Sequence, residues 1–303
     1  MSAEAFAFCS QQTAAVHEPQ AGTAAAGVRW WVMVEYAGVW GSKFVRNSDL
    51  PENIRTHLAR VMDEVEGCRV QLIRRELPPL ANTPLTIYLA DVNDRTPEMF
   101  RLSWPEVATL DQLDLIELCR DPAKRAPYRC DDTALFVCTN GQRDRCCAKF
   151  GLQLFRALAA LEPTQVWQTT HIGGHRFAPT LVSLPDGYCY GHLDPKLSGE
   201  YLDLHRRGHT FPVECIRGRV CYDQPAQAAE VYLRQQLGHR EVGGISWQES
   251  APVEGGFNVG LTTPDGRRVN LWARRSESPG MRPKSCVDAP VGLTPWAVEP
   301  MPG

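Results

Sequence analysis

Two stretches of the chain show the same order of predicted secondary-structure elements. The first opens with a β-branched and aromatic run at 28–36, which predicts a buried strand. Proline at position 51 suits the first turn of a helix. Apolar residues at helical spacing then follow: Ile54, Leu58, Val61, Met62 and Val65. Two more apolar runs, at 69–75 and 85–92, predict strands, so this stretch contains strand, helix, strand and strand.

The second stretch begins near residue 133 and repeats this order. Its patterns predict a strand, a helix, a strand, the two strands of a hairpin and a final helix: 133–137, 147–161, 166–170, 180–184, 187–193 and 198–206. The hairpin rests on Pro185-Asp186-Gly187, residue types that favour a tight turn. Strand, helix, strand, hairpin and helix is the order of a thioredoxin-like unit.

The sequence therefore predicts an α/β (α+β) protein with tandem thioredoxin-like units and a small C-terminal helix-plus-hairpin extension. The expected divisions are an N-terminal leader, a first unit without a cofactor, a second unit with the candidate chemistry, and the extension with its tail: 1–27, 28–125, 126–225 and 226–303. The leader lacks periodicity, so we expect it to lie over the surface or to be partly disordered, with little chemistry. The extension should hold a helix at 226–237 and strands at 256–262 and 268–273. The proline-rich tail beyond Ser276 should lie extended against the body.

Charge and composition narrow the classes of function. A formal net charge of −3 gives no overall basic field, so we expect no nucleic-acid or anionic-membrane partner. No apolar run reaches the roughly 18 residues of a membrane span, and the N-terminus does not resemble a secretion signal. We therefore expect a cytoplasmic protein.

Eleven cysteines are many for such a chain. A reducing cytosol keeps thiols free, so a local concentration of cysteine indicates metal or cluster ligation rather than disulfides. Four scattered cysteines are expected to be small buried hydrophobic residues: Cys68, Cys119, Cys215 and Cys221.

The candidate ligands lie on two predicted loops. Cys138 follows a strand, and Cys146-Cys147 begin a helix, where the helix end favours thiolate. His171 and His175 flank Gly173-Gly174, which makes a tight loop more probable than a helix. In a thioredoxin-like unit these two loops adjoin, so Cys138, Cys147, His171 and His175 can surround one point. Cys146 is an alternative to Cys147.

Zinc and a [2Fe-2S] cluster both accept two cysteines and two histidines. Eight residues separate Cys138 from Cys147, and this wide loop favours a two-iron core over a zinc knuckle. A zinc-stabilised interaction module remains an alternative. A thiol-disulfide or peroxide-reducing enzyme is another, although no C-x-x-C pair stands at the expected place and adjacent cysteines suit a reversible disulfide poorly.

At these motifs the sequence resembles the sucrase/ferredoxin-like family. The resemblance rests on Phe136–Ala148 and His171–Thr180, with flanking support from further segments: 18–24, 34–41, 180–193, 225–230 and 283–286. It implies one [2Fe-2S] cluster, with Cys138 and Cys147 on one iron and His171 and His175 on the other. Asn140 departs from the family pattern, since many relatives have histidine there.

The resemblance implies a non-enzymatic electron carrier rather than a hydrolase, serving an unidentified electron donor, such as a reductase, and an unidentified acceptor. Sucrose hydrolysis is not supported, because no paired carboxylates stand out on facing loops. Two neutral imidazoles in place of thiolates should raise the potential from roughly −400 mV toward the span of roughly −150 to +300 mV, and couple electron uptake to proton uptake.

Several other residues should surround this centre. Four basic residues should form a rim that offsets the cluster charge, docks an acidic reductase or is merely solvated: Arg143, Arg145, Lys149 and Arg176. Cys189 and His192 are expected to pack near the ligands.

Overall fold

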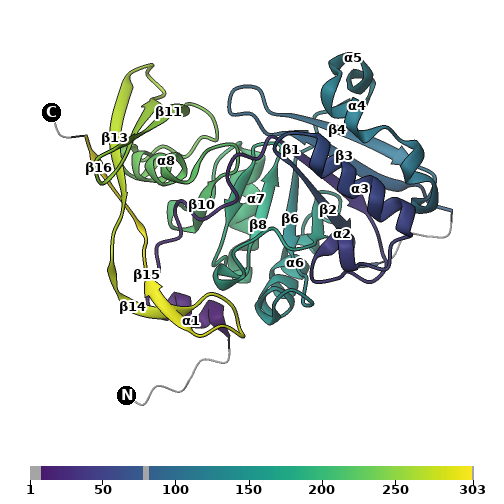
Figure 1. The fold of residues 1–303 in the computed structure, drawn as a ribbon, viewed down its shortest axis with the longest axis horizontal. Coiled ribbons are helices and arrows are strands. Elements are labelled where there is room, and N and C mark those ends of the chain that lie inside the picture. Colours follow the sequence, from purple (N-terminus) through teal and green to yellow (C-terminus); the bar gives the residue numbers. More distant parts are fainter. Residues whose placement is uncertain (1–7, 78–81, 302–303) are drawn as a thin grey trace.

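The computed structural model describes residues 8–77 and 82–301, and within them ten strands form one sheet (Figure 1). Its order is β10-β9-β8-β6-β7-β2-β1-β3-β4-β5. The strands are β1 (Trp30–Glu35), β2 (Cys68–Arg74), β3 (Leu85–Asp91), β4 (Glu98–Trp104), β5 (Arg129–Cys130), β6 (Ala134–Cys138), β7 (Val166–Thr169), β8 (Leu181–Leu184), β9 (Tyr188–Tyr190) and β10 (Ile216–Arg219).

Helices lie between and beyond these strands. They are α1 (Cys9–Ala15), α2 (Phe44–Asn47), α3 (Glu52–Glu64), α4 (Leu115–Arg120), α5 (Pro122–Arg125), α6 (Leu152–Ala159), α7 (Ser198–Arg206) and α8 (Gln224–Leu237). A π-helical turn, Cys147–Gly151, leads directly into α6. Short 3-10 turns occupy Val107–Gln112, Ala126–Tyr128, His175–Phe177, Pro195–Leu197 and Val213–Cys215.

Two halves of the sheet have the same topology. In the first, β1 and β2 are parallel and joined through α3, β3 pairs antiparallel with β1, and β4 pairs antiparallel with β3. In the second, β6, β7, β8 and β9 have the same relations, with α6 between the parallel strands and α7 after the hairpin. The predicted tandem of thioredoxin-like units is therefore confirmed as an α/β arrangement.

The halves join through a short antiparallel pairing of β2 with β7. Only the ends of these strands overlap, at Ile73↔Thr169 and Arg74↔Gln168. Because the parallel strands of each half end here, the loops after β1 and β6 meet. The buried Asn140 side chain donates from Nδ2 to the carbonyl oxygen of Gly41 at 3.0 Å. The first half thus supports the loop that carries the candidate cysteines.

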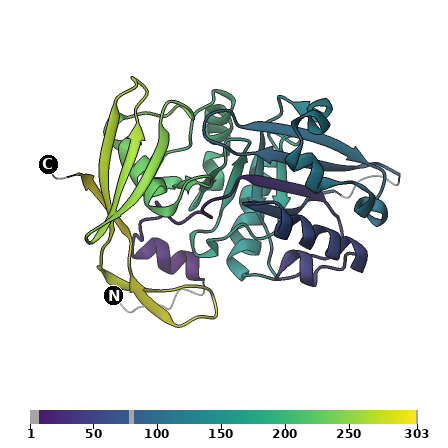
Figure 2. The same cartoon turned by 45° about the horizontal axis from the view of Figure 1, so that its top comes forward.

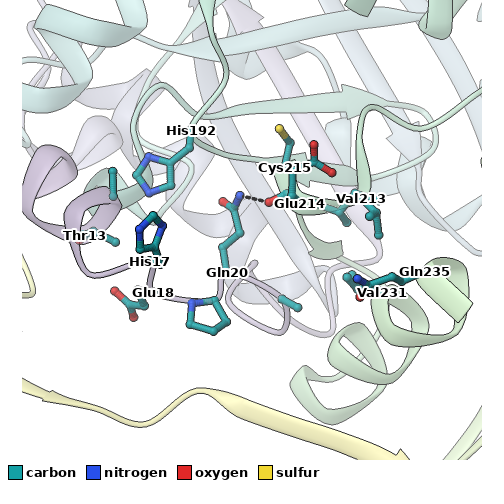
Figure 3. A pocket seen from close by; sticks show the side chains of 14 residues that line it. Thr13, His17, Glu18, Gln20, His192, Val213, Glu214, Cys215, Val231 and Gln235 are labelled. Atoms are coloured by element: carbon teal, nitrogen blue, oxygen red, sulfur yellow. Dashed lines mark hydrogen bonds between the residues drawn. The ribbon is translucent and has the colours of Figure 1, made fainter. Parts of the chain in front are cut away.

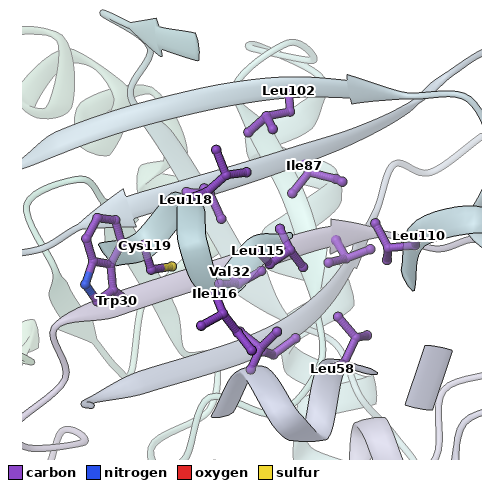
Figure 4. Close-up of a cluster of buried hydrophobic side chains, with 14 of the residues drawn as sticks. Trp30, Val32, Leu58, Ile87, Leu102, Leu110, Leu115, Ile116, Leu118 and Cys119 are labelled. Carbon is purple, nitrogen blue, oxygen red and sulfur yellow. The ribbon is translucent and has the colours of Figure 1, made fainter. Parts of the chain in front are cut away.

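Apolar side chains fill both faces of the sheet, and β1 is buried along its whole length. One core lies between the first half and helices α3 and α4, and includes Trp30, Val32, Leu58, Ile87 and Leu115 (Figure 4). The predicted helix stripe is confirmed there, with Met62 only partly buried. Another core contains Cys138 and Cys147 together with large aromatic side chains: Trp31, Tyr88, Phe136 and Trp167.

The C-terminal extension packs α8 against a second sheet, of order β11-β12-β13-β16 (Figures 1 and 2). Its strands are β11 (Ser246–Val253), β12 (Gly256–Thr262), β13 (Arg268–Arg275) and β16 (Trp296–Pro300). The tail beyond Ser276 is extended as predicted, but it forms paired strands, which the sequence did not predict. Residues beyond Ser276 form the hairpin β14 (Ser278–Pro283) and β15 (Pro290–Leu293), and then β16. Antiparallel pairing satisfies the backbone N–H and C=O groups of these strands, which an isolated extended segment would leave to water.

The leader also differs from expectation. Residues 1–7 lie outside the described residues, but α1 follows them and lies beside the β14–β15 hairpin (Figure 2). Its first residue, Cys9, is fully buried and packs with Cys146 and Cys286 from distant parts of the chain. Among the described helices, we find none whose length and apolar content would let it cross a bilayer.

Candidate metal centre

The cysteine loop begins where β6 ends. Cys138 is the last residue of β6, and Cys147 begins the π-helical turn that leads to α6. Gly151 lies so close to the strand end that a Cβ at this position would collide with the Cys138 carbonyl oxygen. Glycine therefore lets the helix pack on the strand and brings Cys138 and Cys147 to the same buried position.

The histidine loop follows β7. Gly173 and Gly174 have φ values of +96° and +74°, a region that favours glycine. A Cβ on Gly174 would collide with the guanidinium of the buried Arg217, which donates to the Gly173 carbonyl oxygen at 3.0 Å. The predicted tight loop is thus packed on a buried arginine, and His175 begins the 3-10 turn after it.

The structure brings three of the predicted ligands, Cys138, Cys147 and His171, into one group and places His175 next to His171. The Sγ atoms of Cys138 and Cys147 each lie 3.7 Å from Nδ1 of His171. On the other side of the same ring, Nε2 of His171 lies 3.5 Å from Nδ1 of His175. His171 therefore stands between a pair of buried thiols and a second imidazole.

A backbone carbonyl fixes the orientation of His175. Its Nε2 lies 2.8 Å from the carbonyl oxygen of Lys284, in the loop between β14 and β15. Because a carbonyl only accepts hydrogen bonds, Nε2 carries the proton and Nδ1 keeps its lone pair. Burial lowers the pKa of His175, which favours the neutral ring that binds metals. This arrangement, with the outer ring nitrogen on a carbonyl, is common for metal-binding histidines.

The two thiols are electrostatically unequal. The hydrogen bond from Cys147, followed by the effect of His171, holds the pKa of Cys138 well below its usual range. The same hydrogen bond, together with burial, raises the pKa of Cys147 well above its usual range. The hydrogen bond between the two thiols thus favours the thiolate at Cys138, which is the form that metals bind.

Cys146 does not join this group. Its Sγ lies 3.4 Å from that of Cys9 and 3.3 Å from that of Cys286. Adjacent cysteines therefore point to two different clusters, and Cys147 is the one beside Cys138. The sequence reasoning missed Cys9 and Cys286 as candidate residues, although Cys286 lies in one of the segments that carry the family resemblance.

The expected basic rim is only partly available to a partner. Arg176 pairs with the buried carboxylate of Glu18 at 3.1 Å, so it holds the fold together. Lys149 lies 4.5 Å from the ring centre of Phe8. Arg143 and Arg145 are exposed on the cysteine loop, and the Arg145 guanidinium lies 5.7 Å from the ring centre of Phe8.

The two residues expected to pack near the ligands have different surroundings. Cys189 is buried in the same core as Cys138 and Cys147. His192 packs on the ring of Phe177 at 5.5 Å between ring centres, and burial lowers its pKa to about 4.

A separate pocket of about 550 Å³ is lined by residues that include parts of α1 and α8 (Figure 3). Thr13, His17, His192 and Glu214 are among its lining residues, and Gln20 donates to the Glu214 carbonyl oxygen. None of the four candidate ligands lines it. The pocket is therefore distinct from the cysteine and histidine site.

The donor set fits the cofactor expected from the sequence. Two thiols and two neutral imidazoles are a known ligand set for two-iron clusters, with histidine replacing cysteine on one iron. Three of the donors, from Cys138, Cys147 and His171, lie within 4.8 Å of one another, so they can also hold a single ion. The chemistry of the residues is thus that of a metal centre.

Comparison with known proteins places the chain in a family. The family model described as sucrase/ferredoxin-like matches residues 21–218. Among solved structures, the thioredoxin-like [2Fe-2S] ferredoxin from Aquifex aeolicus matches with 22% identity over 29% of this chain and 91% of that one, at a TM-score of 0.25. Two of its cysteine-to-serine variants match at 21% and 25% identity, each over 28% of this chain and 97% of that one, with TM-scores of 0.25 and 0.24. No curated protein matches. Since the family model covers more than half of the sequence, the chain belongs to the sucrase/ferredoxin-like family.

Proposed function

We propose that this protein holds one [2Fe-2S] cluster through Cys138, Cys147, His171 and His175 and carries single electrons between partner proteins. The observation that carries the proposal is the convergence of these side chains, with both thiols 3.7 Å from one imidazole and the second imidazole directly behind it. Family membership and the cysteine-histidine donor set support it.

In this proposal, Cys138 and Cys147 hold one iron and His171 and His175 hold the other. The cluster supplies reversible one-electron reduction, at a potential raised by the two neutral ligands. The chain supplies a buried setting for the thiols and a fixed ring orientation at His175, through the Lys284 carbonyl oxygen. Fixing the ring favours binding because less freedom is lost when the metal centre forms.

The histidine side is the natural place for electron exchange with a partner. Cys138 and Cys147 are at most 1% exposed, whereas the His175 side chain retains 14% exposure. A docking protein can therefore approach the centre most closely through the imidazoles. The Nε2 proton of His175 also lies at this side, where the Lys284 carbonyl oxygen holds it. We propose that the partners are a reductase and an acceptor protein in the cytoplasm, where the described cysteines remain free thiols.

The test is anaerobic purification of the full chain, followed by visible absorption and iron and sulfide analysis. We expect a red-brown protein with about two iron and two sulfide per chain. Cys138→Ser and Cys147→Ser should lose the colour, while Cys215→Ser, a buried cysteine elsewhere in the fold, should keep it. A colourless wild-type protein, or colour that survives in Cys138→Ser, would overturn the proposal.

A zinc centre is the second candidate for the same residues. The observation that favours it is the compact spacing of the three donors, since one ion can span 4.8 Å. Zinc would stabilise the fold and transfer no electrons. Metal analysis of the anaerobic protein separates the two, because zinc without iron or sulfide, lost in Cys138→Ser, would identify this alternative.

A further inference from the structure

A second group of metal-binding side chains lies beside the first. Cys9 begins α1, Cys146 precedes the π-helical turn, and Cys286 lies between β14 and β15. Their Sγ atoms form a triangle with sides of 3.4, 3.3 and 3.6 Å. Asp144 reaches the same point, with Oδ1 3.1 Å from the Cys286 sulfur and 4.0 Å from that of Cys9. Three of these residues are buried and Cys286 is half-buried.

We infer that Cys9, Cys146, Cys286 and Asp144 form a second metal site, which binds one thiophilic divalent ion of the zinc class. This site goes beyond the electron-transfer function proposed above and shares no ligand with it. All four donor atoms lie within 4.8 Å of one another.

The dimensions of the group fit a single tetrahedral ion. With Zn–S bonds of about 2.3 Å, sulfurs at tetrahedral angles stand about 3.8 Å apart, and a carboxylate oxygen stands about 3.6 Å from each sulfur. The observed sulfur triangle is smaller by at most half an ångström, and the Asp144 oxygen distances of 3.1 and 4.0 Å bracket the expected value. Small side-chain rotations would bring the four donors to ideal positions.

A disulfide explains the arrangement less well. A disulfide bond is about 2.0 Å long and joins two sulfurs, so it would leave the third cysteine and the carboxylate unexplained. Here three sulfurs are nearly equidistant, and a carboxylate completes the group. A three-cysteine site with one oxygen ligand accounts for all four side chains at once.

Asp144 also holds the cysteines in place. Its Oδ1 accepts from the backbone N–H of Cys146 at 2.8 Å, and its Oδ2 accepts from that of Cys286 at 3.0 Å. The same Oδ2 lies 3.9 Å from Nε2 of His175. The carboxylate therefore lies between the two groups of ligands. The neighbouring residues Cys146 and Cys147 belong to different groups, Cys146 to the second and Cys147 to the first.

The second site would join three distant parts of the chain. Cys9 and Cys286 belong to segments at opposite ends of the sequence, and Cys146 belongs to the second thioredoxin-like unit. One ion bound by all three closes very long loops, which reduces the freedom of the unfolded chain and couples metal binding to folding. We therefore expect the ion to anchor α1 and the β14–β15 hairpin to the second unit.

The test is metal analysis of the full chain, purified anaerobically from zinc-containing medium, with Cys9→Ser and Cys286→Ser compared with wild type. We expect about one zinc per wild-type chain at this site and the loss of most of this zinc in both variants, with iron and sulfide unchanged. Cys215→Ser is the matched control for losing a buried cysteine, and should keep its zinc.

Cys138→Ser separates this inference from the proposed function. If the first centre holds iron, this variant loses iron and keeps its zinc. If the first centre holds zinc instead, wild type contains about two zinc ions and Cys138→Ser keeps one, so the second site stands although the proposed function fails.

Cobalt titration of the wild-type protein covers the case in which the serine variants do not fold. Thiolate-bound tetrahedral cobalt gives intense visible bands, and we expect them to saturate at about one equivalent and to disappear when excess zinc is added. The inference is overturned by wild-type protein that holds no zinc and gives no such bands. It is equally overturned by full zinc retention in Cys9→Ser and Cys286→Ser, or by mass spectrometry that finds a disulfide within the cysteine triangle.

Discussion

Neutralising Glu18 should weaken the whole fold more than any exposed charge change. The side chain of Glu18 lies largely out of solvent between two arginines from distant segments, Arg176 in the turn His175–Phe177 and Arg282 on β14. Its Oε2 lies 3.1 Å from Arg176 Nε and 2.7 Å from Arg282 Nε, and its Oε1 lies 2.8 Å from Arg282 Nη2. Glu18→Gln keeps the size of the side chain but leaves two guanidinium groups without a counter-charge.

The magnitude follows from the burial of the three side chains. Removing one partner of a buried ion pair costs about 3–5 kcal/mol, because the remaining charge stays desolvated. The side chains of Glu18 and Arg282 are 6% and 9% exposed, whereas that of Arg176 is 21% exposed and can partly regain water. We therefore expect Glu18→Gln to reduce the free energy of unfolding by about 3 kcal/mol, near the lower end of that range.

The assay is guanidinium denaturation followed by far-UV circular dichroism, with the slope of the transition checked for constancy. Asp203→Asn is the matched control, since Asp203 pairs with Arg206 while both side chains are at least half exposed, and it should cost less than about 1 kcal/mol. Adding Arg282→Met to Glu18→Gln should recover part of the loss. A loss for Glu18→Gln no larger than that of Asp203→Asn would refute the reasoning.

Three further predictions concern the helix contact, a buried histidine and the metal centre. Gly151→Ala should cost about 3 kcal/mol and lower the iron content, because its Cβ would collide with the Cys138 carbonyl oxygen. Gly199→Ala, in α7, meets no atom within 4 Å and should lower neither the stability nor the iron content, as thermal denaturation and iron analysis can check. Burial lowers the pKa of His205 from 6.5 to about 4, so the folded protein resists a proton that the unfolded chain accepts. The contribution of the neutral His205 ring to stability is full above about pH 6.5 and falls by roughly 3 kcal/mol toward pH 4. Urea denaturation across this range should show a shallower decline of the unfolding free energy for His205→Phe than for wild type, and equal declines would contradict the assignment. If imidazoles bind the iron, the midpoint potential of the cluster should fall as pH rises, by up to about 59 mV per pH unit. Protein-film voltammetry measures this, and a constant midpoint potential from about pH 6 to 10 would argue against histidine ligands.

Local patterns predicted most elements of the two units because their strands and helices are strongly apolar and regularly spaced. The helix at 198–206 and the strand at 256–262 have the bounds expected from the sequence. Strand β4 was not predicted, although it alternates buried Phe100 and Leu102 with exposed Arg101 and Ser103. Strands β11 and β16 have no buried residue, so their hydrophobic pattern is weak.

Long-range pairing was less accessible from the sequence. Nothing local in β2 or β7 indicates that they would join at two paired positions and make one sheet of two units. The first centre could be predicted because its ligands lie on adjoining loops of one unit. The second cysteine group could not, since Cys9, Cys146 and Cys286 are each separated by more than a hundred residues and lie in segments without a shared repeat.

The narrow seam between β2 and β7 limits how the protein can be divided. A fragment beginning near residue 126 would contain all four candidate ligands of the first centre, yet it would present β7 to water with its outer backbone groups unpaired. Such an uncovered strand invites pairing with another copy. It would also lack Gly41, whose carbonyl oxygen receives the Asn140 amide. The half without ligands therefore serves as a permanent cover for the half that has them, and efforts to make a minimal redox fragment should keep both.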